Sequence, residues 1–177
     1  MAYPKITVNT GKALSLIASD SIPIPYVDAI QLVGVASATT ADKLVAAQSD
    51  FSNVTVGDIV YNTTDNTSTT VTAVDSSTQL SVANNIFANN ENFIVFQAGP
   101  VFERRTDSSS GCLLYVGSSE GTMDVEKSFV DVKVKTVAGS IVTFSNFPVG
   151  EYLPVQVVQL YATGTDAAAD NNCLAIW

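Results

Sequence analysis

The sequence predicts an all-β protein: a jelly-roll-like β-sandwich with a small SH3/OB-like β-barrel inserted into it. Three observations support this fold class. Apolar and polar residues alternate along many short runs, and these runs are rich in β-branched residues. Turn-forming residues recur at short spacing, while patterns with the helical period are scarce. The chain has 177 residues, which suits one domain with an insertion.

The host sandwich is assigned to residues 1–36 and 98–177. Each strand that we predict in it is a short apolar run bounded by Gly, Pro, Asn, Asp or Ser. The predicted host strands are Ile6–Asn9, Ala29–Val35, Cys112–Val116, Thr122–Phe129, Asp131–Val137, Ile141–Phe144, Leu153–Tyr161 and Leu174–Trp177.

Residues 37–97 predict the inserted barrel, because about five short strands fall within few residues. The run "TTDNTS" is a loop of turn formers, and Asp75-Ser76-Ser77 joins two of the strands. The predicted strands of the insert are Lys43–Ala47, Asp58–Tyr61, Thr69–Val74, Gln79–Ala83 and Phe93–Gln97.

The hairpin "DVKVKTVAGSIVTFSNF" is the clearest local signal. Val132 and Val134 alternate with charged residues, which predicts one buried face and one wet face. Gly139 supplies the positive φ that a tight turn requires.

The last two predicted strands are strongly apolar. Leu153–Tyr161 has apolar residues on both faces, so we expect a second sheet or a neighbouring subunit to cover it, with an interface near Tyr161. Trp177 either closes the sheet or caps a subunit contact. We predict that Cys112 and Cys173 are buried reduced thiols, although a disulfide between them is the alternative.

Composition narrows the function classes. The net charge is −9, and only Arg104 and Arg105 form a basic pair, which argues against nucleic-acid binding. Histidine is absent, which removes the commonest general base and metal ligand. No apolar run is long enough to span a bilayer. We therefore expect no enzyme activity, cofactor, nucleic acid or membrane partner.

Three sets of residues are candidate sites. Glu120, Asp124 and Glu126 offer carboxylates for Ca²⁺, but a solvated strand face is the preferred interpretation. Arg104 and Arg105 form either an ion pair with an acidic partner or a surface pair near the domain junction. A sugar-binding platform would need clustered aromatic residues, and the aromatic residues here are scattered along the strands.

The order of motifs in the C-terminal half resembles the head-spike base proteins of tailed phages and gene transfer agents. The opening "SDSIPIPYVDAI" resembles the first segment of that family, and "VGDIVYNTTDNTSTTVTAVDSSTQLSV" resembles a module of marine phage structural proteins. The link "DAAADNN" is longer than is usual in the family. The positions that carry the resemblance are Tyr115-Val116-Gly117, Val142-Thr143-Phe144, Pro148–Gly150, Leu153-Pro154-Val155, Ala162–Thr165 and Leu174–Trp177.

The resemblance implies a structural virion protein that is made in the host cytoplasm and bound to the outside of the capsid, as a decoration protein or a head-spike or fibre base. The implied partners are the major capsid protein, copies of the chain itself in a homotrimer or homopentamer, and a fibre protein. The expected interface residues are Arg104, Arg105, Tyr161 and Trp177. The alternatives are a neck, tail or fibre-adaptor protein and a carbohydrate-binding module.

Overall fold

The computed structural model describes residues 11–98, 111–117, 129–166 and 172–177. These residues form antiparallel sheets and one short 3-10 helix, Val27–Ala29, so the all-β prediction is confirmed. The strands are β1 (Ala13–Ser15), β2 (Ile30–Val35), β3 (Lys43–Val45), β4 (Ile59–Asn62), β5 (Thr67–Ser76), β6 (Gln79–Val82), β7 (Asn92–Phe96), β8 (Leu113–Tyr115), β9 (Phe129–Thr136), β10 (Ile141–Pro148), β11 (Val157–Leu160) and β12 (Leu174–Ile176).

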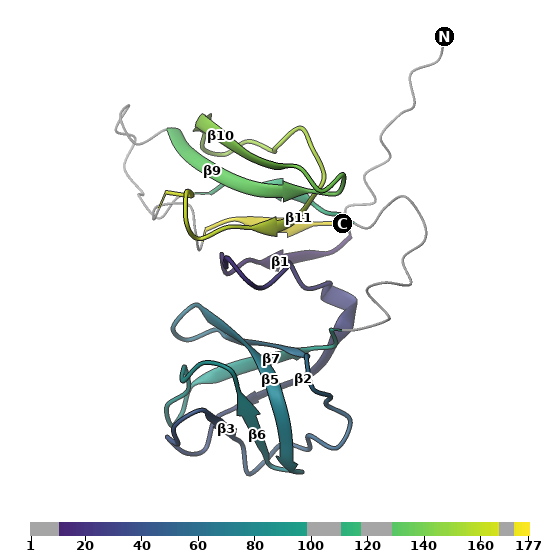
Figure 1. The fold of residues 1–177 in the computed structure, drawn as a ribbon, viewed down its shortest axis with the longest axis vertical. Coiled ribbons are helices and arrows are strands. Elements are labelled where there is room, and N and C mark those ends of the chain that lie inside the picture. Colours follow the sequence, from purple (N-terminus) through teal and green to yellow (C-terminus); the bar gives the residue numbers. More distant parts are fainter. Residues whose placement is uncertain (1–10, 99–110, 118–128, 167–171) are drawn as a thin grey trace.

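The strands fall into two halves that are stacked along the long axis of the molecule (Figure 1). One half is a six-stranded sheet with the order β2-β7-β4-β5-β6-β3. This sheet curls, and its two edges approach where Ala38 bridges Val45 and the Ser37 amide donates to the Val45 carbonyl at 2.7 Å. The curled sheet corresponds to the predicted insert but also takes in β2, which we had assigned to the host, because β2 pairs with β7.

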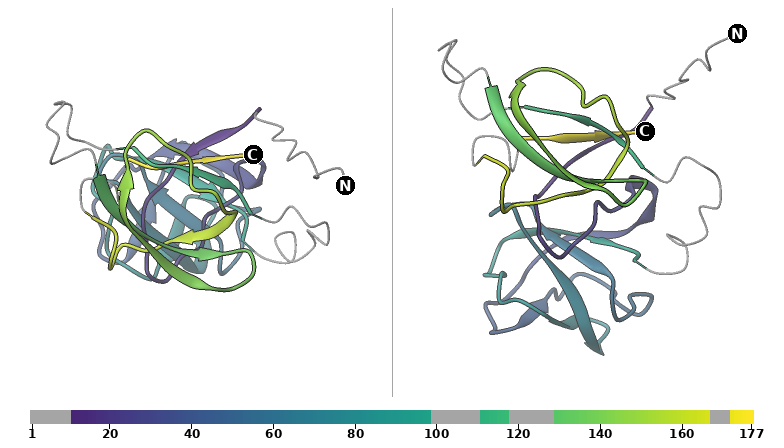
Figure 2. Two further views of the ribbon diagram at one scale, coloured as in Figure 1. Left: turned by 90° about the horizontal axis from the view of Figure 1, so that it is seen from above. Right: turned by 45° about the horizontal axis from the view of Figure 1, so that its top comes forward.

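The other half contains two three-stranded sheets, β1-β12-β8 and β10-β9-β11. Both sheets line one apolar core, and Figure 2 shows them from two further sides. Val132 and Val134 of β9 point into this core, as the hairpin pattern predicted, and Gly139 adopts φ 86° in the turn. A bridge from Cys112, just before β8, reaches Val157, the first residue of β11, and a bridge from Tyr115 reaches Tyr152 in the preceding segment.

One strand prediction needs correction. Of the expected strand Leu153–Tyr161, only Val157–Leu160 is regular strand. Pro154 has no amide hydrogen to donate to a neighbouring strand. Just before it, Leu153 bonds to β8. The Leu153 amide, for example, donates to the Leu114 carbonyl at 2.9 Å. Strand β1 was missed. The prediction Ile6–Asn9 and all but the last residue of Thr122–Phe129 lie outside the described residues.

Apolar packing joins the two halves. All four residues of β4 are buried, because both faces of this strand are covered. Val60 packs into the core of the curled sheet, whereas Ile59 and Tyr61 belong to the core of the sandwich. Phe96 packs edge-on against Tyr61, with ring centroids 5.1 Å apart. The sandwich therefore covers the outer side of the curled sheet at β4 and β7.

A buried carboxylate fixes the two points where the chain enters and leaves the curled sheet. Asp58 is fully buried and accepts hydrogen bonds from the Thr55 amide at 2.8 Å, the Ala98 amide at 3.0 Å and the Gln31 side chain at 3.1 Å. Gln31 lies on the entering strand and Ala98 follows the leaving strand. A buried charge requires such partners, so Asp58 holds both connections in place.

Candidate binding surface

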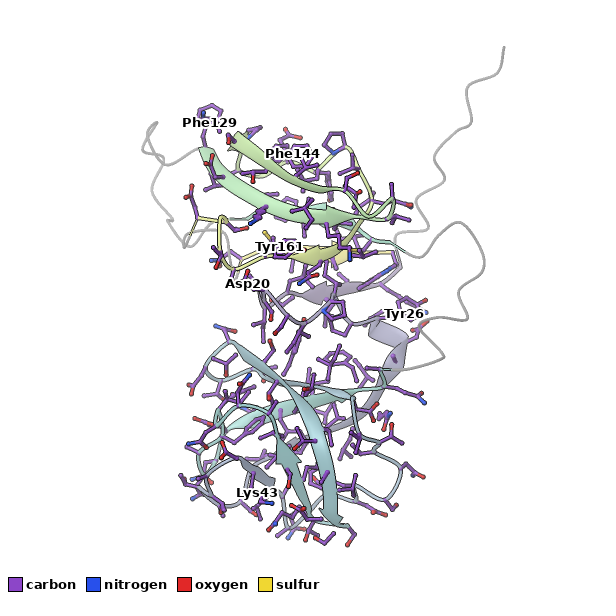
Figure 3. The ribbon with its side chains drawn as sticks, in the orientation of Figure 1. Asp20, Tyr26, Lys43, Phe129, Phe144 and Tyr161 are labelled. Atoms are coloured by element: carbon purple, nitrogen blue, oxygen red, sulfur yellow. The ribbon has the colours of Figure 1, made fainter. Side chains whose placement is uncertain are left out.

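Among the described residues of the sandwich half, the outward face of the β9–β10 hairpin exposes two large apolar side chains. Phe129, Lys133 and Lys135 project from β9 on this side, and Ile141 of β10 lies directly opposite Lys135. Phe129 is 51% exposed and Ile141 is 57% exposed. We call these four residues the outer face. Figure 3 shows Phe129 at the end of the molecule opposite Lys43 of the curled sheet.

The outer face combines apolar groups with positive charge. Neither Lys133 nor Lys135 belongs to an ion pair with another described residue. The Lys133 ammonium lies 5.2 Å from the centroid of the Tyr161 ring, which is cation–π geometry. Asp131 lies on the same side of β9, between Phe129 and Lys133, so this side of the strand is mixed in charge. Lys133 and Lys135 suit acidic groups on a partner.

Strand β10 is also an open sheet edge. Among the described residues it pairs with β9 alone, and no backbone hydrogen bond joins it to another described strand. Edge strands are usually protected by charges, prolines or bulges. Here a bulge between Phe144 and Phe147 and the residue Pro148 interrupt only the second half of β10.

The first half of β10, Ile141–Phe144, has none of these protections. Val142 faces the core side opposite Val134 but remains 38% exposed, and no further strand among residues 11–98, 111–117, 129–166 and 172–177 covers it. We call Ile141–Phe144 the β10 edge. Sequence reasoning expected this hairpin to have one wet face and missed the open edge. The available signal was the absence of any charged residue between Lys135 and Glu151.

The predicted interface residues are separated in the structure. Tyr161 is half-buried beside the outer face, and its amide donates to the Lys133 carbonyl at 2.9 Å. Trp177 is half-buried, its amide donates to the Lys12 carbonyl at 3.0 Å, and its ring packs edge-on against Tyr26. Arg104 and Arg105 lie outside the described residues, as do Glu120, Asp124 and Glu126.

Trp177 thus makes intramolecular contacts beside the sheet β1-β12-β8. Whether it also meets a second subunit stays a prediction, as does the role of Tyr161.

The two cysteines lie in the sandwich core as predicted. No disulfide joins Cys112 and Cys173, and both side chains are buried. Burial raises the pKa of the Cys112 thiol to about 12, so this thiol stays protonated at neutral pH. A protonated and buried thiol is a poor nucleophile, so Cys112 serves packing.

The described residues were also compared with the requirements of metal sites, sugar-binding platforms and membrane spans. Within the described residues, no group of three or more Cys, Asp or Glu side chains lies close enough to hold a metal ion. Tyr115 and Tyr152 form an aromatic pair, but their rings are inclined at 61° to each other. A sugar ring stacks on a flat platform, which this pair does not provide. No helix among the described residues is long and apolar enough to cross a bilayer.

Comparisons with known proteins give no identity for the chain: no family model, no curated protein and no solved structure matches it.

Proposed function

We propose that this protein is a structural component of a tailed bacteriophage virion and binds the exterior of the capsid as a decoration protein or a head-spike or fibre base. The observation that carries the proposal is the outer face: Phe129 and Ile141 are exposed beside two lysines that lack an ion pair among the described residues. The order of motifs in the C-terminal strands, which resembles head-spike base proteins, supports the same function.

The outer face would bind an acidic, apolar patch of the major capsid protein. Burial of apolar area supplies affinity, at about 25 cal/mol per Å² removed from water, and the lysines favour the acidic partner. Copies of the chain associated in a ring would bind several capsomers at once, which adds avidity. The curled sheet lies at the opposite end of the long axis, so it would project away from the capsid toward a fibre protein (Figure 1).

A neck, tail or fibre-adaptor protein could use the same face. Identification of the partner protein would distinguish these positions from a position on the capsid. The inclined rings of Tyr115 and Tyr152 do not favour a carbohydrate-binding module.

Co-sedimentation with capsids tests the proposal. Purified protein is mixed with capsids of the phage that encodes it, prepared without this chain, and the bound fraction is measured in the pellet. We expect saturable binding by the wild-type protein and at least a tenfold loss of affinity for Ile141→Asp, because a charge then replaces one of the two exposed apolar side chains of the outer face.

The matched control is Val33→Asp, which places the same charge at a site that is 64% exposed on the curled sheet. This variant should bind like the wild type. Absence of wild-type binding to capsids, or equal binding by Ile141→Asp and Val33→Asp, would contradict the proposed role of the outer face.

A further inference from the structure

We infer that the β10 edges of two copies of this chain pair as antiparallel strands around a two-fold axis at Val142. Two sheets of the sandwich half then form one continuous sheet, in which the β10 strands lie side by side at the centre. This inference names the contact behind the self-association in the proposed function, and it rests on that function for its role on the capsid.

Strand β10 has the longest open edge in the described part of the sandwich half. The outer edge of β11 is covered, because the Ser19 amide donates to the Leu160 carbonyl at 2.9 Å. The outer edge of β8 is covered in the same way, since the Leu153 amide donates to the Leu114 carbonyl. Strand β1 has only three residues. Figure 1 shows β10 at the end of the molecule away from the curled sheet, which therefore does not block this edge.

The hydrogen-bonding groups of the β10 edge follow from the ladder with β9. The Thr136 amide donates to the Ser140 carbonyl at 2.9 Å, so these two residues belong to a hydrogen-bonded pair. Such pairs recur at every second residue of an antiparallel ladder, which makes Val142 the next residue of β10 that bonds to β9. The N–H and C=O groups of Ile141 and Thr143 therefore point away from β9, toward the open edge.

A second copy of β10 offers the same groups in the matching positions. Core-side residues must lie opposite core-side residues, so the two-fold axis passes through a residue. With Val142 on the axis, Ile141 of each copy lies opposite Thr143 of the other, and each of these two pairs exchanges both backbone hydrogen bonds. An axis at Thr143 would instead bond Ile141 to Ser145, which lies in the bulge, and an axis at Ile141 would bond Thr143 to Gly139, which lies in the turn.

The side chains also match in this register. On the core side, the two copies of Val142 meet at the axis, with Cα atoms about 4.5 Å apart. Each valine then covers the exposed part of the other, and Val134 of each β9 extends the apolar row. On the outer side, Thr143 lies between Lys133 of its own copy and Ile141 of the other copy.

Charge permits the approach of a second copy. No residue of β10 is charged, and the lysines beside it project from β9. In the paired sheet, Lys135 of one copy and Lys133 of the other lie three strand spacings apart, about 14 Å. This separation exceeds the screening distance of about 8 Å at physiological ionic strength. The net charge of −9 makes the rest of the two chains repel, so pairing should strengthen when salt is added.

The contact is small, and its symmetry suits a surface-bound protein. Interfaces below about 1,000 Å² are generally weak, so we expect a dimer that forms only above micromolar concentrations. The axis crosses the plane of the sheet, so both outer faces lie on the same side and can bind one capsid together. By itself the contact gives a dimer rather than the trimer or pentamer that the resemblance implies; between two such rings on a capsid it would join one copy of each.

Oxidation of single-cysteine variants tests the position of the axis. Val142→Cys places one thiol of each copy at the axis, so this variant alone should form a disulfide-linked homodimer. Copies of Thr143→Cys are offset from each other and should give little homodimer, whereas a mixture of Thr143→Cys and Ile141→Cys should give the mixed dimer. Cys112 and Cys173 are buried and should not compete.

The control for random collision is Val56→Cys, because Val56 is 66% exposed and lies outside the strands. Homodimer formation by Val142→Cys that is no faster than that of Val56→Cys would overturn the inference. A faster reaction of Thr143→Cys than of Val142→Cys would also overturn it, because the axis would then not lie at Val142.

Val142→Lys separates this inference from the proposed function. Two lysines at the axis repel, so light scattering above micromolar concentration should give half the molar mass of the wild type, with an unchanged far-UV circular dichroism spectrum. Val56→Lys should associate like the wild type. Equal association of Val142→Lys and the wild type would overturn the inference.

The two proposals can also fail separately. The outer face is intact in Val142→Lys, so this variant should still bind capsids, with weaker affinity because single copies bind. A wild-type protein that binds capsids but shows no two-fold association even at millimolar concentration would overturn the inference alone. A wild-type protein that associates through Val142 but does not bind capsids would overturn the proposed function and leave the β10 contact standing.

Discussion

At the scale of single residues, Asp58 illustrates how one polar group can control the arrangement of a fold. Its carboxylate is fully buried and accepts bonds from the entering strand, the leaving strand and its own turn. The sequence places this residue beside a turn glycine, where an exposed aspartate would be the ordinary expectation. Its burial depends on contacts with distant residues, which no local pattern encodes.

Replacement of Asp58 by alanine should lower the free energy of unfolding by about 3 kcal/mol, because the donors on Gln31, Thr55 and Ala98 lose their buried, charged acceptor. Denaturant unfolding followed by circular dichroism measures this change. Asp50→Ala is the control, because Asp50 is exposed and accepts a bond from the Ser52 amide; its cost should stay below about 1 kcal/mol. Equal losses in the two variants would refute the role given to Asp58.

Asp75 makes the stability of the curled sheet sensitive to acid. Its hydrogen bond to Lys43, at 2.8 Å, and bonds from Gln79 and Ser81 lower the pKa of the Asp75 carboxyl from 3.8 to about 2. The unfolded chain therefore binds this proton more readily than the folded protein. The contribution of Asp75 to stability is present above pH 4 and is lost as the pH falls from about 4 to 2.

Asp75→Asn should flatten the fall in melting temperature over this pH range. Melting curves of the wild type and the variant, recorded by differential scanning calorimetry at several pH values, should converge toward pH 2 and separate above pH 4. Parallel curves for the two proteins would show that the Asp75 carboxylate makes no such contribution.

At the scale of elements, the sequence was most informative where alternation and turn chemistry act locally. The β9–β10 hairpin and most strands of the curled sheet were predicted within a few residues, because side-chain period and turn glycines determine them. The extent of β11 and the assignment of β2 were not predicted, since each depends on which distant strand is the pairing partner. The open β10 edge was missed for the same reason: exposure depends on a neighbour that is absent from the described fold.

Strand β12 is a central element despite its short length. It lies between β1 and β8, and Cys173 and Ala175 are fully buried there. Deletion of Cys173–Trp177 should therefore abolish cooperative folding or disassemble the protein, because β1 and β8 both lose their partner. Circular dichroism melting and light scattering check this prediction, and a truncated protein with unchanged melting temperature and oligomeric state would refute it.

At the scale of the whole molecule, the two halves should unfold together. The core of the sandwich includes Ile59, Tyr61 and Phe96 from the curled sheet, so the sandwich does not complete its core without the curled sheet. The single tryptophan, Trp177, lies in the sandwich and gives a probe of that half.

Leu80→Ala, which creates a cavity in the core of the curled sheet, tests this coupling. Leu80 is fully buried, so the variant should lose about 3 kcal/mol. The transition of Trp177 fluorescence should shift to lower denaturant by the same amount as the transition seen by circular dichroism. A fluorescence transition that stays at its wild-type position would mean that the halves unfold independently.

The central claim is the proposed place of this protein on a tailed phage particle, and a cryo-electron microscopy map of the particle that is proposed to carry it tests that claim most directly. We predict density for the chain on the outside of the capsid, in a closed ring of copies, with Phe129 and Ile141 toward the capsid shell and the curled sheet pointing outward. A map of the complete particle that contains no copy of this chain would contradict the account.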